Sequence, residues 1–231
     1  MRGMAYRVSW RRRWVRGVLR WVFRGVFRLL FRLRFEGWEH LPREGGHLVV
    51  YNHVSILEPP LLLAFWPRQA EAVAAVEVFQ RSFQRTLVRW YAAIPVRRGV
   101  PDRRLLDTMV AVLRSGLPLL LAPEGGRSHR PGLRRAWTGV AYVVDRAQVP
   151  VVPVGVMGST DEALKAALRF RRPRIEVRIG EPFTLPPLAR PGVSRKEARR
   201  ANADAIMYRI AALLPPAYRG VYGEPAAEAG E

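Results

Sequence analysis

Residues 47–59, HLVVYNHVSILEP, change from a strand pattern to a helical one, and this change decides the fold. The run HLVVY is typical of a buried strand. Asn52, Ser55 and Glu58 are residue types that cap helices, and Pro59 suits the first helical position. We therefore expect a buried strand, then a loop that holds His53, then a helix that begins near Glu58 with Ser55 as its cap.

His53 and Glu58 are a candidate pair for acid–base chemistry. A histidine that accepts a proton needs a nearby carboxylate to orient its ring and to stabilise the imidazolium. On one continuous helix, residues five apart would point about 140° away from each other. The two side chains can therefore meet only if His53 lies in the loop and Glu58 at the helix start.

Strands and helices alternate along the rest of the chain. The apolar runs 117–122 and 151–157 predict interior strands, and 102–115 predicts an amphipathic helix. Further strands are expected at 34–37, 70–76, 93–96 and 174–179, the last at an edge or half-exposed, and further helices at 60–65, 79–91, 135–147 (Trp137 facing inward) and 194–214. This alternation predicts an α/β fold with a mixed, largely parallel sheet flanked by helices.

Polar residues gather at the ends of three predicted strands: at 52–58, at Arg97-Arg98, and at Glu124-Gly125-Gly126-Arg127. The carboxyl ends of parallel strands meet at one sheet edge, so we expect a single site. The arginines would supply hydrogen-bond donors suited to a phosphate. Gly125 and Gly126 would let the backbone approach a ligand closely. The pattern does not decide which of Arg97 and Arg98 faces the site.

Residues 1–35 hold eleven arginines and no acidic residue. On a helix, an apolar arc of about 120° forms and the arginines at every fourth position face away from it. The arc contains Val15, Val18, Leu19, Val22, Val26, Leu29, Leu30 and Leu33, the arginines are Arg16, Arg20 and Arg24, and Trp10, Trp14 and Trp21 lie at one border. Such tryptophans, with arginines that can snorkel, suit a helix lying in the headgroup layer. We expect residues 1–33 to form a basic amphipathic membrane-interface helix.

Other interpretations of this segment are open. Its regular arginines leave no span of about 18 uncharged residues, which disfavours a transmembrane helix, and it lacks the apolar core and cleavage site of a signal peptide. The helix could pack on its own domain or bind nucleic acid, but valine and leucine beside interfacial tryptophan favour lipid. We expect residues 34–222 to form one domain and 223–231 a disordered tail.

The whole chain carries a net charge of +20, which calls for a polyanionic neighbour: nucleic acid, an anionic membrane, or acidic partners and substrates. It contains no cysteine, which excludes disulfides and thiolate chemistry. The four histidines (His40, His47, His53, His129) show no paired spacing, so we expect no metal site.

Together these motifs resemble the glycerolipid acyltransferase superfamily, whose best-known bacterial members are 1-acyl-glycerol-3-phosphate acyltransferases. The family motif NHxSxxDP is matched at Asn52, His53, Ser55, Glu58 and Pro59, with glutamate in place of aspartate. The motif FPEGTRS is matched by residues 122–128, APEGGRS, with Ala122 and Gly126 as departures. A strand ending in a basic residue matches at 94–98, and a VP-type strand at 149–153. Order and spacing agree over roughly residues 35–180.

The resemblance implies a direct acyl transfer that needs no metal and no cofactor, with acyl-CoA or acyl carrier protein as cosubstrate. His53 would take the proton from an acceptor hydroxyl as that oxygen attacks the thioester carbonyl, while Glu58 holds the ring. Backbone amides near Gly125-Gly126 or His53 would stabilise the oxyanion. Arg127, with Arg97 or Arg98, would bind the acceptor phosphate. Glu124 would position the loop that carries Arg127. Asn52, Glu124, Gly125 and Gly126 are counted with these arginines as substrate-binding residues.

The implied acceptor is a lysophosphatidic acid-like glycerolipid, with glycerol 3-phosphate or another lysolipid as the alternative. A non-catalytic basic protein that binds membranes or nucleic acid would explain the charge, but it leaves the His53–Glu58 pair unexplained. The expected partners are an anionic membrane surface, the acyl donor and the glycerolipid, and not nucleic acid. The expected location is the cytoplasmic face of the cell membrane, through the N-terminal helix as a peripheral or monotopic anchor.

Overall fold

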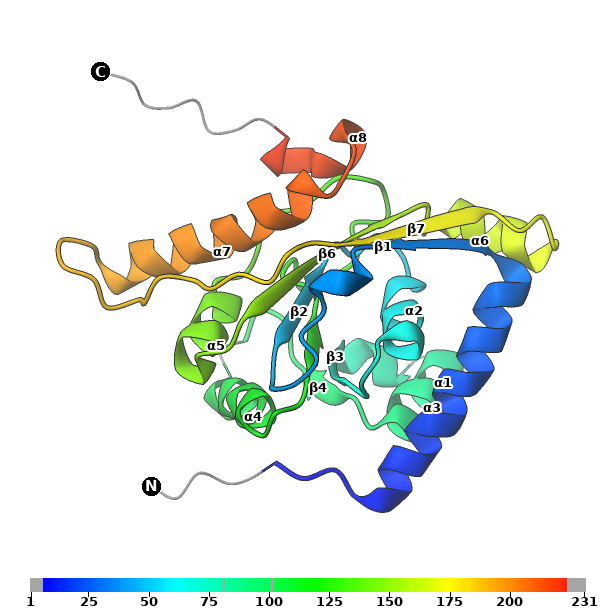
Figure 1. Ribbon diagram of the computed structural model, residues 1–231, viewed down its shortest axis with the longest axis horizontal. Coiled ribbons are helices and arrows are strands. Elements are labelled where there is room, and N and C mark those ends of the chain that lie inside the picture. The colour runs from blue at the N-terminus through cyan, green and yellow to red at the C-terminus, as the bar shows by residue number, and fades with distance from the viewer. Residues whose placement is uncertain (1–5, 81, 101, 224–231) are drawn as a thin grey trace.

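Seven strands form one sheet in the computed structural model, which describes residues 6–80, 82–100 and 102–223 (Figure 1). Their order across the sheet is β1-β7-β6-β2-β5-β3-β4. The strands are β1 (Arg32–Glu36), β2 (Leu48–Tyr51), β3 (Glu71–Ala75), β4 (Ile94–Val96), β5 (Leu119–Leu121), β6 (Val151–Met157) and β7 (Arg174–Ile179). The apolar strands β2, β5 and β6 lie inside the sheet, as their composition predicted.

The sheet is mixed and largely parallel, which confirms the predicted fold class. Strands β2 to β6 pair in parallel with their neighbours, and only β7 runs antiparallel to β6, with Val154 opposite Ile179. β1 pairs in parallel with β7 and forms the outer edge. The interpretation of β7 as an edge strand is therefore wrong, while its half-exposed alternation is confirmed because Ile175, Val177 and Ile179 are buried.

Helices cover both faces of the sheet, with α4, α5 and α7 on one side and α1 and α2 on the other (Figure 1). Strand β2 shows why its sequence is continuously apolar: Leu48 and Val50 join one core while Val49 and Tyr51 join the other. The helices are α1 (Trp10–Leu30), α2 (Glu58–Phe65), α3 (Ser82–Tyr91), α4 (Arg103–Arg114), α5 (Gly139–Ala147), α6 (Asp161–Leu168), α7 (Arg195–Ala212) and α8 (Pro216–Arg219), with short 3-10 turns at Trp38–His40, Val76–Gln80 and Gly220–Tyr222.

Two helix predictions differ from the structure, and one helix was not predicted. The helix expected at 79–91 is split into a 3-10 turn and α3. The helix expected at 135–147 begins only at Gly139, and Trp137 is exposed rather than inward-facing. Helix α6 was not predicted, although Thr160 caps it by accepting a hydrogen bond from the Ala163 amide and Asp161 and Glu162 occupy its first turn.

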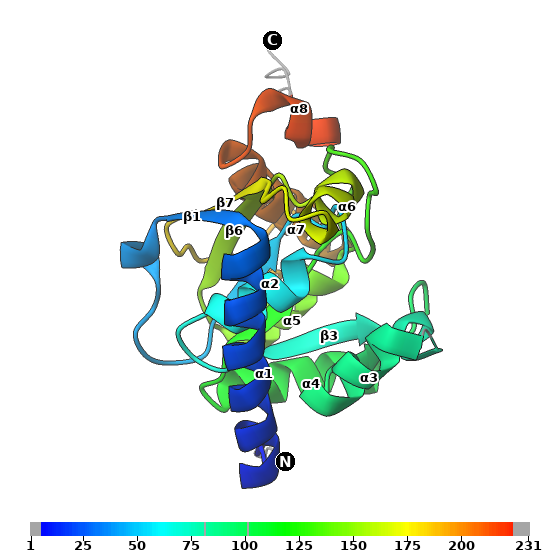
Figure 2. The same cartoon turned by 90° about the vertical axis from the view of Figure 1, so that its right-hand side faces the viewer.

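Helix α1 packs on α2 and α3 through its arginine face (Figure 2). The Arg16 side chain is buried and donates to both carboxylate oxygens of Glu71, at 2.5 and 2.8 Å. Arg20 and Arg24 donate to the carbonyl oxygens of Trp66 and Ala64. These three arginines face away from the apolar arc, as expected, but protein acceptors bind them, so the helix packs on its own domain through this face.

The opposite face of α1 is apolar and exposed. Its exposed large hydrophobic residues are Trp10, Trp14, Val18, Trp21, Val22, Val26 and Leu29. No helix in the described part of the chain is both long and apolar enough to cross a membrane. The division into segments 1–33 and 34–222 stays a prediction, and the predicted tail 223–231 lies outside the described residues except for Gly223.

Candidate active site

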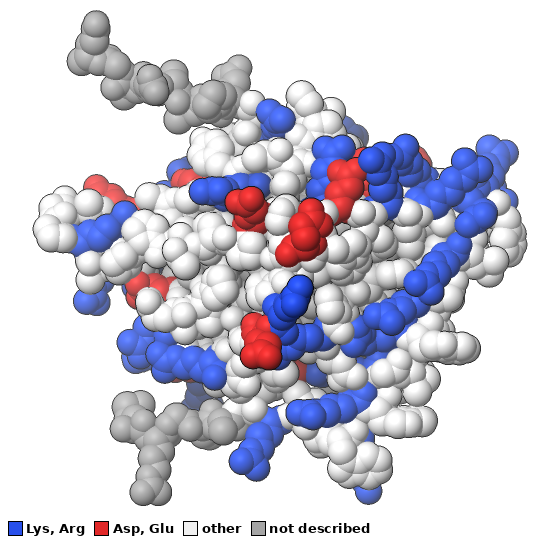
Figure 3. Space-filling view, viewed as in Figure 1, with Lys and Arg blue, Asp and Glu red and all other residues white. Residues whose placement is uncertain are grey.

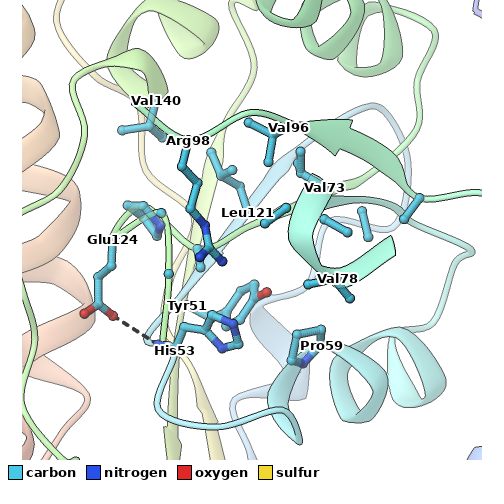
Figure 4. Close-up of a pocket in the computed structure, with 18 of the residues that line it drawn as sticks. Tyr51, His53, Pro59, Val73, Val78, Val96, Arg98, Leu121, Glu124 and Val140 are labelled. Carbon is cyan, nitrogen blue, oxygen red and sulfur yellow. Dashed lines mark hydrogen bonds between the residues drawn. The ribbon is translucent and has the colours of Figure 1, made fainter. Parts of the chain in front are cut away.

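The loops that follow β2, β4 and β5 meet at one edge of the sheet, as their parallel pairing requires (Figure 4). They bring together His53, Arg98 and Glu124, which lie far apart in the sequence. The three predicted loops therefore line one cleft, whose volume is about 1650 Å³.

His53 and Glu58 meet as predicted. The Nδ1 atom of His53 lies 2.9 Å from Glu58 Oε2. Glu58 is the first residue of α2 and is fully buried, whereas the His53 side chain is 15% exposed and faces the cleft. The carboxylate thus lies behind the ring, where it orients the imidazole, and the ring is the member of the pair that a substrate can reach.

Ser55 shapes the turn between the two residues. Its amide donates to the Glu58 carboxylate at 3.0 and 3.1 Å, and its hydroxyl oxygen accepts from the Leu57 amide at 3.1 Å. Leu57, not Ser55, is the N-cap residue of α2. The prediction of Ser55 as helix cap is therefore wrong in position, but Ser55 does fix the Glu58 side chain and the turn that leads into the helix.

Ser159 is a site residue that the sequence interpretation missed. Its hydroxyl lies 2.5 Å from Glu58 Oε1, and the residue is fully buried in the loop after β6. The signal was available: β6 was predicted to end at Met157, so a polar residue two positions later belongs to the same sheet edge as the other three loops. The Glu58 carboxylate is consequently bonded both by Ser55, in the turn before α2, and by Ser159, in the loop after β6.

Asn52 has a role other than substrate binding. Its side-chain amide nitrogen donates to the Val156 carbonyl oxygen at 2.8 Å, and its oxygen accepts from the Val156 amide at 2.7 Å. The residue is buried. Asn52 thus ties the His53 loop to β6, and it does not line the cleft.

Glu124 links the two principal loops. One carboxylate oxygen accepts from the His53 amide at 3.0 Å and the other from the Arg134 amide at 2.9 Å (Figure 4). Its side chain is buried, and this burial raises the pKa of the Glu124 carboxyl against the opposing effect of the two backbone donors. The contacts place Glu124 in a loop-positioning role, as expected.

The Gly125-Gly126 turn needs a glycine at position 125. Gly125 has φ of 69°, and a Cβ atom there would lie 2.7 Å from the Trp137 ring. A Cβ atom on Gly126 would lie 3.4 Å from the Arg98 guanidinium. The exposed Trp137 and the Arg98 side chain therefore cover this turn closely.

Arg98 extends over the cleft toward Tyr51 and His53 (Figure 4). Arg97 and Arg127 also line the cleft. The structure thus brings all three predicted cationic residues to the site, and the orientation of Arg98 favours it over Arg97 as the one that faces His53.

The cleft walls beyond His53 are mostly apolar. They include Tyr51, Val73, Val78, Val96 and Leu121, and residues of α1 extend the wall (Figure 4). Tyr51 meets the His53 ring edge-on, with ring centroids 5.9 Å apart. Burial raises the pKa of the Tyr51 phenol, which keeps it neutral.

The site combines a proton acceptor, cationic side chains and a long apolar wall. Within residues 6–80, 82–100 and 102–223, no three His, Asp or Glu side chains converge as metal ligands would. Such an arrangement can activate a hydroxyl group on a molecule that carries both an anionic group and a hydrocarbon chain.

Residues 32–157 match the acyltransferase family. The 1-acyl-sn-glycerol-3-phosphate acyltransferase of Bacillus subtilis (strain 168) is 26% identical over 175 residues, which cover 74% of this chain and 83% of that protein. The alpha form of the same enzyme from Mus musculus is 25% identical over 179 residues, or 75% of this chain. The match spans about 60% of the length of the mouse protein.

The fold is similar to that of a solved structure, the 1-acyl-sn-glycerophosphate acyltransferase of Thermotoga maritima. The TM-score is 0.60 with 22% sequence identity, over 84% of this chain and 79% of that one. At this identity the likeness bears on the fold alone.

Proposed function

Because this chain belongs to the acyltransferase family, we propose that it is an O-acyltransferase acting on a lysophosphatidic acid-like glycerolipid. The names of its relatives in Bacillus subtilis and Mus musculus support this acceptor class. The observation that carries the proposal is the contact of 2.9 Å between His53 and the buried Glu58 at the apolar cleft. The proposed donor is a thioester, either acyl-CoA or acyl carrier protein.

His53 is the proposed general base. With its Nδ1 hydrogen bonded to Glu58, the ring presents Nε2 to the acceptor hydroxyl and removes its proton while the oxygen attacks the thioester carbonyl carbon. The carbon–sulfur bond then breaks, and the proton held by His53 passes to the leaving sulfur. The products are the ester and the free thiol, so no acyl-enzyme is required.

Backbone amides are the proposed donors for the tetrahedral oxyanion. The Gly125 amide already donates to the Ala122 carbonyl oxygen at 3.0 Å, and the His53 amide donates to Glu124. We therefore assign the oxyanion to the Gly126 amide, which lies in the turn beside Arg98.

Arg98 and Arg127 are the proposed phosphate-binding residues, with Arg97 as an outer contact. An arginine presents paired N–H groups that match phosphate oxygens. The apolar wall formed by Val73, Val96 and Leu121 suits a fatty acyl chain.

Helix α1 is the proposed membrane contact. Its arginine face is held by the protein, and its apolar face is exposed, with Trp21 at 78% exposure. Tryptophan and aliphatic side chains on one helix face favour the interfacial region of a bilayer. This orientation supports peripheral attachment and would bring the cleft, which α1 also lines, to the lipid surface.

The test is acyl transfer by the full chain in anionic vesicles, with labelled acyl-CoA and acyl carrier protein supplied separately. The acceptors are lysophosphatidic acid, glycerol 3-phosphate and phosphate-free lysolipids. His53→Ala should abolish transfer while vesicle binding survives. His40→Ala is the matched control, because His40 bonds the Ile179 carbonyl oxygen away from the cleft. Unchanged activity of His53→Ala would refute the mechanism, and transfer only to glycerol 3-phosphate would refute the acceptor class.

A further inference from the structure

The segment that connects α6 to β7, residues 168–174, is a second exposed apolar and basic surface. Leu168 is 66% exposed and Phe170 is 70% exposed. Four arginines lie beside these two residues in the segment, which contains no acidic residue: Arg169, Arg171, Arg172 and Arg174. Two large apolar side chains in water beside so many cations call for a partner that accommodates both.

The backbone holds Phe170 outward in a definite conformation. Phe170 has φ of 55° and Arg172 has φ of 47°, in the left-handed region that favours glycine. Two hydrogen bonds support this turn: the Phe170 amide donates to the Ala167 carbonyl oxygen at 2.8 Å, and the Arg171 amide to Ala166 at 3.1 Å. The segment is therefore an ordered turn that presents an apolar tip.

This turn is joined to the carboxyl end of α1 (Figures 1 and 2). The Arg172 guanidinium donates to the Arg28 carbonyl oxygen at 3.0 Å, and the Arg32 amide donates to the Pro173 carbonyl oxygen at 2.9 Å. Leu168 lines the same cleft as Val26 of α1. The exposed apolar face of α1 and the 168–174 turn are therefore neighbours, and each contributes one residue, Val26 and Leu168, to the cleft wall.

The charge around the 168–174 turn is positive, although Arg34 and Arg174 are paired with Glu36 and Glu176. A hollow of about 630 Å³ lies between the turn and β1, and it is lined by Arg32, Leu33, Arg34, Arg171, Arg172, Pro173 and Arg174. Figure 3 shows basic side chains in a band along α1 and gathered at the α6–β7 end of the molecule. Converging guanidinium groups suit the phosphates of anionic lipids, each basic residue adding to the attraction at the membrane surface.

We propose that residues 168–174 form a second membrane contact, in which Leu168 and Phe170 enter the interfacial layer and the exposed side chains of Arg169 and Arg171 bind anionic headgroups. The inference rests on the proposed membrane association of α1, and it adds how the protein is oriented on the membrane. A single interfacial helix can roll about its own axis, whereas a second contact beside its carboxyl end fixes the cleft mouth against the bilayer.

The absence of cysteine from the sequence permits a direct test. Three variants each carry one environment-sensitive fluorophore on a single introduced cysteine. The substitutions are Phe170→Cys in the turn, Val22→Cys on α1, and Val193→Cys before α7 as an exposed control. With vesicles of phosphatidylcholine and phosphatidylglycerol, the labels at 170 and 22 should shift to the blue and brighten, and the label at 193 should not. Vesicles of phosphatidylcholine alone should give a weaker response at 170.

The outcomes separate the two proposals. If the label at 22 responds and the label at 170 stays in water, the second contact is overturned while attachment through α1 stands. A response at 170 to polyglutamate but not to vesicles would identify an acidic protein partner and also overturn it. An unlabelled Phe170→Ser variant should bind anionic vesicles about tenfold or more weakly, as the loss of a buried phenyl group predicts, and Val193→Ser should bind like the parent.

Discussion

Ser159 Oγ lies 2.5 Å from Glu58 Oε1, although the two residues are 101 positions apart in the sequence. Glu58 is fully buried and its other oxygen contacts His53, so its carboxylate depends on donors from the protein. A glutamate carries its carboxylate one methylene further than an aspartate. The Ser159 hydroxyl meets the oxygen that points away from the histidine and so fixes this longer side chain.

Ser159→Ala should therefore lower kcat by about 10- to 100-fold, as the loss of a hydrogen bond to a charged group predicts, with little change in KM for either substrate. Ser159→Thr keeps the hydroxyl and should recover most of the rate. Steady-state kinetics in vesicles measures both. An equal loss in the two variants would show that the site needs the space around Ser159 rather than its hydroxyl.

Arg98 and Arg97 should differ in their effect on the acceptor. Arg98 extends over the cleft toward His53 (Figure 4), so Arg98→Gln should raise KM for the phosphate-bearing acceptor by about tenfold or more. Arg97→Gln is the matched control and should change it by only about twofold. The measurement is the KM for lysophosphatidic acid of both variants. A larger increase for Arg97→Gln than for Arg98→Gln would assign phosphate binding to Arg97.

The buried ion pair between Arg16 and Glu71 should dominate the docking of α1. Arg16→Met leaves a buried carboxylate without its partner, which costs about 3 to 5 kcal/mol of the free energy of unfolding. The double variant Arg16→Met with Glu71→Leu should recover much of this loss, because no buried charge is then left unpaired. Urea unfolding of the three proteins is the measurement. Equal stability of the single and double variants would contradict the ion-pair explanation.

His47 should make stability depend on pH. Burial, aided by the charge of Arg68, lowers the pKa of His47 from 6.5 to about 4. Between pH 6.5 and 4, His47 is therefore protonated in the unfolded chain and neutral in the folded chain. The free energy of unfolding falls as the pH is lowered through this range. The full contribution is about 3 kcal/mol.

His47→Asn should flatten this part of the pH profile. His47 Nε2 lies 3.2 Å from Trp66 Nε1, and asparagine can retain an acceptor there without taking up a proton. Unfolding of the parent and variant between pH 4 and 7 provides the comparison. Profiles of the same slope would rule out His47 as the source.

Local sequence determined the alternation of strands and helices, the inner positions of β2, β5 and β6, and the convergence of three loops at one edge. It did so because strand and helix periods, together with parallel pairing, are readable over a few residues. The His53–Glu58 contact followed from the same local information, since five residues and a helix start define it.

Tertiary structure alone decided what depends on distant partners. Arg16, Arg20 and Arg24 of α1 turn inward, where Arg16 pairs with a buried carboxylate 55 positions away, and this leaves the apolar face outward. The Asn52 side chain bonds to the backbone of Val156, 104 positions away, and does not line the cleft. Periodicity reports which residues share a face, but the choice of which face is buried depends on the desolvation and pairing of groups that only the folded chain brings together.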